Sequence, residues 1–443
     1  MIRRPPRSTL DRSSAASDVY KRQGQSAEIP IQILHGSKTG PIISIIGAIH
    51  GDELNGTGII HHLVYGDDHK PDTADDHIDL GYLPADLFLE RLPPKLKDRG
   101  PHVEEKNGKE MWVCDGSTFG VWSAGRWEQD TSRTIKVALD RVPFEGNYGI
   151  RPTTTHLRLE DMDRDGVKFS VMYPPIFGMR MEDKELGIAV NRAYNEWAAD
   201  FEKSAPDRFR VVAQLLPDDP EGSKDEMLRC AGMGIRQVNF LVGTVSSAMY
   251  QPAWDSFWDA AEANNIVVNY HVGGPSRTGT FNSTQTQEQN ARKPGFGMGL
   301  GDGATVFLQP FIGLFSYGIL EKRPDLRVVL AESGTGWIPF QVQEMDYRFN
   351  RVLEGRIPPG FDLERLPSEV FKKQVWATYQ QDLVGLNLIP FFGEGHMMWA
   401  SDYPHPDSTW PNSVEILDKE MQNIDPLMRQ KITHDNAKAF YSL

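Results

Sequence analysis

MMWASDYPHP, residues 397–406, is the stretch that decides the fold. A short apolar run stops abruptly at Asp402, and turn-forming residues follow, which is the pattern of a buried strand that ends at the aspartate. In a parallel α/β barrel, an acidic residue at the carboxyl end of a strand lies at the rim where the chemistry takes place. An aspartate there can equally cap the next turn, so the interpretation depends on how the other strands end.

Short apolar runs alternate with longer amphipathic segments from about Ala74 to the C-terminus. Eight runs have the length and composition of buried strands, at 75–80, 167–173, 210–216, 237–242, 266–271, 328–332, 375–379 and 397–402. The segments with helical length and pattern are 185–203, 223–232, 253–264, 306–322 and 338–351. This alternation predicts a (β/α)8 TIM barrel. The span Leu83–His156, rich in proline, glycine and charge, predicts an insertion after the first strand, with short strands at 111–113 and 118–121.

The first 73 residues do not follow the barrel pattern. Residues 1–23 are polar and resemble translated sequencing-adapter sequence, so we expect them to be disordered and artefactual. Residues 24–66 include GAIHGDE and resemble the start of the succinylglutamate desuccinylase/aspartoacylase family, in which His50 and Glu53 match two zinc ligands. Because the later histidine and catalytic glutamate of that family have no counterpart, we interpret 24–73 as a truncated, non-functional fragment joined near 66–74 to a barrel domain of 74–443. A genuine two-domain fusion is the alternative.

Composition limits the partners. The 443 residues carry a net charge of −14, with 61 acidic against 47 basic residues, which argues against a nucleic-acid or anionic-membrane surface. The longest apolar run, Pro41–Ile49, is too short to span a bilayer, and no secretory signal is recognisable. Cys114 and Cys230 form neither a CxxC motif nor a disulfide framework. We therefore expect a cytoplasmic protein that acts on a small molecule.

Metal-binding residue types recur at the predicted strand ends. Asp75 and His77 are two residues apart, so both can face the barrel interior. His271 ends the fifth strand before two glycines, Glu332 ends the sixth, and Asp402 ends the eighth. Each has a structural explanation when taken singly, as a hydrogen-bonded histidine or a capping carboxylate. Four strand ends of this kind together predict a site for a divalent transition metal, with zinc first by ligand type.

Seven short motifs carry a family resemblance: DDHIDL (75–80), RLPPKLKDR (91–99), DMDRDGV (161–167), YHVGG (270–274), RPDLR (323–327), AESGTGW (331–337) and SDYPHP (401–406). With them, residues 74–443 resemble the amidohydrolase-related branch of the amidohydrolase superfamily, which includes aminocarboxymuconate-semialdehyde decarboxylase. The resemblance implies a metal-dependent barrel enzyme, a homodimer, and metal ligands at Asp75, His77, His271 and Asp402.

Two departures from the family pattern affect the metal. Many superfamily members begin with His-x-His, where this chain has Asp75 and His77, and some place a histidine where it has Glu332. Fewer imidazoles leave manganese or iron as alternatives to zinc.

Two reactions on a small organic acid fit these residues. In a non-oxidative decarboxylase, which the resemblance favours, Asp402, Glu332 or His405 protonates the carbon that loses CO₂. In a hydrolase of an amide, lactone or ester, the ion lowers the pKa of its bound water to about 7 and a carboxylate takes the proton. A non-catalytic barrel with a decayed metal site is a third possibility. Candidates for binding the substrate are Arg126, Arg180 and Trp337.

Overall fold

The computed structural model divides into two compact units, Met1–Gly66 and Asp67–Leu443. It describes residues 71–122, 141–144, 147–175, 181–217, 219–273, 302–356, 363–405 and 408–441, together with the backbone of 15–22 and 25–32. In the first unit, β1 (Ala15–Arg22) and β2 (Gln25–Gln32) form an antiparallel pair. The interpretations of 1–23 as disordered and artefactual and of 24–73 as a truncated fragment stay predictions. His50 and Glu53 lie outside the described residues.

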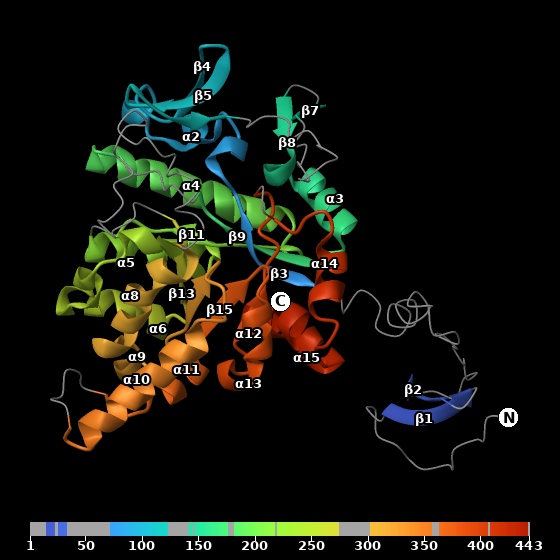
Figure 1. Cartoon of the computed structure of the whole chain (residues 1–443). Coiled ribbons are helices and arrows are strands. Elements are labelled where there is room, and N and C mark those ends of the chain that lie inside the picture. The colour runs from blue at the N-terminus through green and yellow to red at the C-terminus, as the bar shows by residue number, and fades with distance from the viewer. Residues whose placement is uncertain are drawn as a thin grey trace, which may run out of the picture. The chain divides into compact units, whose positions relative to one another are not determined.

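The second unit contains a parallel barrel (Figure 1). Its strands within the described residues are β3 (Asp72–His77), β9 (Phe169–Tyr173), β10 (Phe209–Val211) with β11 (Ala213–Gln214), β12 (Gln237–Leu241), β13 (Val267–His271), β14 (Val328–Ala331), β15 (Val375–Tyr379) and β16 (Met397–Trp399). They form two sheets, in the orders β10-β9-β3 and β11-β12-β13-β14-β15-β16, in which all neighbours are parallel. The parallel barrel that the sequence predicts is confirmed.

Backbone hydrogen bonds join the two sheets on both sides. β10 and β11 are two parts of one strand, and Val212 between them donates its N–H to β9 at 2.9 Å. On the other side, Asp402 N–H donates to the carbonyl of Asp75 at 3.0 Å, and His77 N–H donates to the carbonyl of Tyr403 at 2.7 Å. We call these last two bonds the β16–β3 seam. They connect the chain after the last strand to the first strand.

Helices cover the outside of the barrel (Figure 1). Their bounds in chain order are α3 (Thr155–Asp165), α4 (Lys184–Ser204), α5 (Pro220–Met233), α6 (Asp255–Ala263), α8 (Asp302–Ser316), α9 (Ile319–Lys322), α10 (Ile338–Leu353), α11 (Pro367–Gln374), α12 (Leu383–Asn387), α13 (Ile389–Phe392), α14 (Ser413–Glu420), α15 (Pro426–Gln430) and α16 (Asn436–Tyr441). Of the helices in the described part of the chain, none combines the length and apolar character needed to cross a membrane.

The core consists of two apolar clusters, because side chains alternate along each strand. In β14, Val328 and Leu330 belong to the cluster that includes the outer helices, whereas Val329 and Ala331 belong to the second cluster. The second cluster also contains Phe440 of α16, so the C-terminal helix packs against this inward-facing set. Both clusters are almost fully buried.

The insertion after β3 has its own small sheets. It contains α2 (Leu87–Arg91), the sheet β4 (His102–Lys106), β5 (Lys109–Cys114) and β6 (Ser117–Val121), and the pair β7 (Arg141–Phe144) and β8 (Asn147–Ile150). The turn between β4 and β5 places Asn107 and Gly108 at φ of 55° and 72°, as a two-residue hairpin turn requires. Trp112 Nε1 donates to the carbonyl of Leu80 at 2.6 Å and ties this sheet to the barrel.

The first barrel strand lies earlier in the chain than expected. The sequence predicts 75–80, but β3 covers 72–77, and Leu80–Tyr82 forms a 3-10 turn. Polar residues inside the barrel concealed the true start, because Asp72 and Thr73 are buried although they are not apolar.

Candidate metal centre

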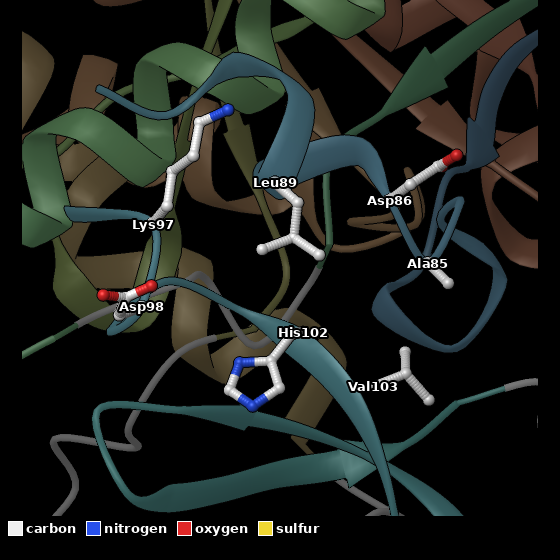
Figure 2. Close-up of a pocket in the computed structure, with 7 residues that line it drawn as sticks. All are labelled: Ala85, Asp86, Leu89, Lys97, Asp98, His102 and Val103. Carbon is white, nitrogen blue, oxygen red and sulfur yellow. The ribbon is translucent and has the colours of Figure 1, made fainter. Parts of the chain in front are cut away.

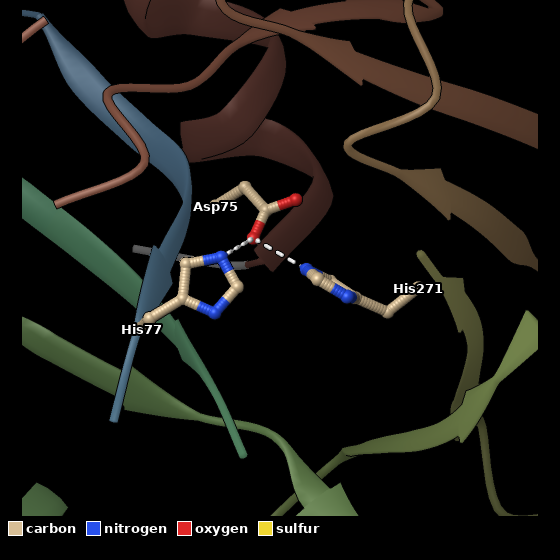
Figure 3. A group of neighbouring side chains, drawn as sticks. All are labelled: Asp75, His77 and His271. Atoms are coloured by element: carbon tan, nitrogen blue, oxygen red, sulfur yellow. Dashed lines mark ion pairs between the residues drawn. The ribbon is translucent and has the colours of Figure 1, made fainter. Parts of the chain in front are cut away.

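Three buried side chains from two strands converge at the carboxyl ends of β3 and β13 (Figure 3). Asp75 Oδ1 lies 3.8 Å from His77 Nε2 and 3.4 Å from His271 Nε2. Asp75 and His77 are two residues apart on one strand and therefore face the same side. Their side chains and that of His271 are at most 1% exposed.

Two more carboxylates reach the same place from the ends of β14 and β16. Asp402 Oδ1 lies 2.8 Å from His77 Nε2, and Glu332 Oε2 lies 3.4 Å from His271 Nε2. Both acidic residues adopt left-handed backbone conformations, with φ of 62° for Asp402 and 58° for Glu332. Such a conformation costs about 1–3 kcal/mol, so the surrounding contacts must hold these two residues in place. The structure thus brings together Asp75, His77, His271, Glu332 and Asp402.

The donor atoms of this cluster fit a divalent cation. Among the described residues, each of these five side chains has at least one buried donor or acceptor atom whose close contacts are ion pairs within the cluster rather than regular hydrogen bonds: Asp75 Oδ1, His77 Nε2, His271 Nε2, Glu332 Oε2 and Asp402 Oδ1. Buried polar atoms are normally hydrogen-bonded, so atoms without regular hydrogen bonds in one cluster indicate a missing ligand. Ligands about 2.1 Å from one ion lie roughly 3.0–3.5 Å apart, and the contacts described above, at 2.8–3.8 Å, bracket this range. Imidazole and carboxylate together are suitable donors for a divalent transition metal.

The orientation of His271 supports coordination through Nε2. Its Nδ1 lies 2.7 Å from the carbonyl of Val272, which can only accept, so Nδ1 carries a proton. Burial disfavours the charged imidazole, but Asp75 and Glu332 outweigh it and raise the pKa of His271 to about 9. A metal ion at Nε2 must therefore displace a proton.

His405 lies between two carboxylates beside the cluster. Its Nδ1 is 2.8 Å from Asp402 Oδ1, its Nε2 is 2.9 Å from Asp79 Oδ2, and its ring stacks on His77 at 3.8 Å. Burial disfavours its charged form, but the two carboxylates outweigh burial and raise the pKa of His405 well above its usual value. Asp79 was not among the site residues predicted from the sequence. Its position two residues after His77 was the available signal.

The two rim carboxyls differ in protonation. Burial, followed by the charge of Asp402, raises the pKa of Glu332 to about 8, so Glu332 holds a proton at neutral pH. Burial also acts on Asp402, but hydrogen bonding and charge from His405 and His77 hold the pKa of Asp402 far below its usual value. In the metal-free protein, these environments therefore favour the ionised form of Asp402 and the protonated form of Glu332.

Asp76, the neighbouring carboxylate, points away from the cluster. It accepts from Ser170 Oγ at 2.6 Å and Arg158 Nη2 at 2.9 Å, and it also bonds Ser401. Because adjacent strand residues face opposite sides, Asp75 faces the ligands and Asp76 serves this buried network.

Of the three sequence-predicted substrate-binding residues, Trp337 is among the described residues. Trp337 donates from Nε1 to the carbonyl of Ser333 at 3.0 Å and packs edge-on against Phe311. Its indole N–H is therefore used within the loop after β14. Arg126 and Arg180 lie outside the described residues.

A separate cavity of about 640 Å³ lies on the insertion (Figure 2). Its lining residues are Ala85, Asp86, Leu89, Lys97, Asp98, His102 and Val103. None of these residues belongs to the metal cluster, and His102 is already bonded to Glu104 and the carbonyl of Gly100. The converging donor atoms, rather than this cavity, therefore form the candidate site.

A parallel barrel with imidazoles and carboxylates at its strand ends defines a metal-dependent barrel enzyme. Residues 116–443 match the amidohydrolase family model, and this chain belongs to that family. The match begins within the insertion, so Asp75 and His77 are assigned on the structure.

Similar proteins include decarboxylases. A gamma-resorcylate decarboxylase of Rhodococcus jostii strain RHA1 is 24% identical over 312 residues, which cover 65% of this chain and 87% of the relative. An amidohydrolase from Mycobacterium avium subsp. paratuberculosis has a similar structure, with a TM-score of 0.63, 18% identity, and coverage of 84% of this chain and 98% of the other. A dihydroxybenzoic acid decarboxylase from Polaromonas sp. JS666, solved with bound manganese and an inhibitor, gives a TM-score of 0.52 at 17% identity, with 66% and 86% coverage. These structural similarities support the barrel fold.

Proposed function

We propose that this protein is a metal-dependent decarboxylase that removes CO₂ from a hydroxylated aromatic acid without oxidation. The observation that carries the proposal is the convergence of Asp75, His77, His271, Glu332 and Asp402 at one rim of the barrel, with their donor atoms buried and close together. Two carboxyls whose environments push their pKa values apart have the complementary states that acid catalysis requires. The decarboxylases among the similar proteins point to aromatic acids as the substrate class.

Four side chains are suited to hold the metal: Asp75, His77, His271 and Asp402. When bound, a divalent ion supplies a positive charge that holds an anionic substrate and stabilises the charge that develops as CO₂ leaves. His405 pairs with Asp402 and fixes the orientation of that carboxylate. Asp79 in turn holds the far side of the His405 ring.

Glu332 is the proposed proton donor. Its side chain is 19% exposed, against at most 1% for the four proposed ligands, so it can recover a proton from solvent. Its proton goes to the ring carbon that bears the carboxylate. The bond between this carbon and the carboxylate then breaks, its electron pair returns to the ring, and CO₂ leaves. Glu332 remains as a carboxylate until it is protonated again.

Manganese is the first metal to test. Two imidazoles with two carboxylates make an oxygen-rich site that suits Mn²⁺ as well as Zn²⁺ or Fe²⁺. The Polaromonas relative was solved with manganese. Metal analysis after loading with each ion separately distinguishes these three.

The proposed assembly is a cytoplasmic homodimer. Analytical ultracentrifugation of the full chain tests the dimer, and a single monomeric species at micromolar concentration contradicts it. Fractionation of cells that express the full chain tests the location.

The reaction is tested with Mn²⁺-loaded protein and a panel of hydroxybenzoic acids. We expect metal-dependent CO₂ release and, in D₂O, one deuterium at the carbon that loses the carboxylate. His271→Ala should abolish both, while His102→Ala, which changes a histidine on the insertion, should preserve them. Amide or lactone cleavage without CO₂ release across the panel would show that the protein is a hydrolase.

A further inference from the structure

One hydroxyl on β15 joins two residues of the metal centre that come from different strands. Thr378 Oγ1 donates to Asp75 Oδ2 at 3.1 Å and accepts from the N–H of Glu332 at 2.7 Å. The Thr378 side chain is completely buried. β15 provides none of the proposed ligands, yet this residue contacts both the first-strand ligand and the proposed acid.

The direction of each hydrogen bond follows from the chemistry of the partners. A backbone N–H can only donate, so Thr378 Oγ1 accepts from the N–H of Glu332. The hydroxyl proton of Thr378 is then donated to the Asp75 carboxylate. This bond occupies Asp75 Oδ2 and leaves Oδ1 without a hydrogen-bond partner, 3.4 Å from His271 Nε2. The β-branched side chain is stiff at χ1, so the strand backbone sets the direction of the hydroxyl.

The second bond holds the backbone where the chain turns after β14. Glu332 has a φ of 58°, which is unfavourable for a residue with a Cβ atom. Its N–H is anchored by Thr378, and its carboxyl oxygen lies 3.4 Å from His271 Nε2. The same hydroxyl therefore positions one ligand atom and the turn that carries the acid.

We propose that Thr378 is a positioning residue that sets the metal affinity through Asp75 and places the proton donor through Glu332. The ordinary alternative is a buried threonine whose hydroxyl merely finds partners inside the barrel. The two readings differ because only a positioning role requires metal binding to depend on the hydroxyl. The inference rests on the metal centre proposed above.

The test compares Thr378→Val, which keeps the shape but loses the hydroxyl, with Thr378→Ser, which keeps the hydroxyl. Thr433→Val is the matched control, because Thr433 is buried and its hydroxyl donates to the carbonyl of Arg429, away from the centre. Mn²⁺ affinity is measured by competition with a chelating dye, and the bound ion is observed by electron paramagnetic resonance. Loss of an outer hydrogen bond to a ligand typically weakens metal binding about 10–100-fold.

We expect Thr378→Val to weaken Mn²⁺ binding at least about tenfold, to alter the spectrum and to lower kcat more than it changes KM. Thr378→Ser should restore all three, and Thr433→Val should match the wild type. Wild-type affinity in Thr378→Val, or equal loss in Thr378→Ser, would overturn the proposal. If circular dichroism shows that Thr378→Val does not fold, Thr378→Ala gives the same comparison with a smaller side chain.

The outcomes separate this inference from the proposed reaction. Normal Mn²⁺ binding by the wild type without CO₂ release overturns the decarboxylase but leaves the Thr378 comparison intact. A wild type that binds none of Mn²⁺, Zn²⁺ and Fe²⁺ overturns the metal centre and the role of Thr378 with it.

Discussion

Replacing Glu332 with glutamine removes the proposed acid and little else. The side chain keeps its size and can still hydrogen bond, and the residue is not among the four proposed metal ligands. With a pKa of about 8 in the metal-free protein, Glu332 is roughly nine-tenths protonated at pH 7. A positioned general acid contributes about 10²–10⁴-fold to a rate, or roughly 3–5 kcal/mol at 1.36 kcal/mol per factor of ten. We therefore expect Glu332→Gln to lower kcat by about 10²–10⁴-fold.

The assay is CO₂ release by the Mn²⁺-loaded enzyme as a function of pH. In the wild type, kcat should fall about tenfold per pH unit once Glu332 ionises. A bound cation stabilises the carboxylate, so this fall should begin at or below about pH 8. In Glu332→Gln, kcat should no longer decrease with rising pH in this range, and the metal content should stay unchanged. Glu202→Gln is the control, because burial raises the pKa of Glu202 too, but its carboxylate accepts from the N–H of Val211 instead.

Two results would refute this reasoning. Glu332→Gln with kcat within about threefold of the wild type would show that another group donates the proton. A large decrease in kcat together with loss of bound Mn²⁺ would instead identify Glu332 as a metal ligand. In the first case, Asp402 and His405 become the groups to test.

Three further predictions concern metal and protons. Saturating Mn²⁺ at 1,000 times its Kd should add about 4 kcal/mol to the free energy of unfolding, and a chelator should reverse the increase in Tm; no shift would contradict the metal centre. Because the pKa of His271 is raised to about 9 and only the neutral imidazole binds metal, Mn²⁺ affinity should increase from pH 6 to about 9, and calorimetry in two buffers should detect proton release. Burial raises the pKa of Asp165 to about 7, because the ionised carboxylate loses its hydration in the folded state. Relative to Asp165→Asn, the wild type should therefore lose stability as pH rises from about 4 to 7, by at most roughly 4 kcal/mol, and a constant difference in urea unfolding would contradict this.

The barrel could be predicted from the sequence because hydrophobic periodicity is a local property of the chain. Each buried strand is a short apolar run, and the strand-end rule places Asp402, Glu332 and His271 on one rim before any contact is known. The i, i+2 spacing of Asp75 and His77 makes them face one side. These arguments use positions within single strands, so they need no knowledge of the pairing between strands.

The contacts that tune the site depend on distant residues, and the sequence did not reveal them. Thr378 and Asp75 are 303 positions apart, and Asp79 and His405 are 326 positions apart. A threonine in a buried strand has no local feature that separates a positioning role from packing. The buried polar start of β3 was missed for the same reason, since Thr73 is stabilised inside the barrel by Asp76, Ser401 and the backbone.

The β16–β3 seam makes the barrel and the metal centre interdependent. The bonds that close this side, Asp402 N–H to Asp75 and His77 N–H to Tyr403, are made by three of the four proposed ligands. The Asp79–His405 pair crosses the same seam, because Asp79 follows β3 and His405 follows β16. A cation that binds Asp75 and His77 on one side and Asp402 on the other must therefore also hold the first and last strands together. Metal binding should protect the amides of Asp402 and His77 from hydrogen exchange more than amides at the middle of β12, because opening the seam then requires the ion to be released.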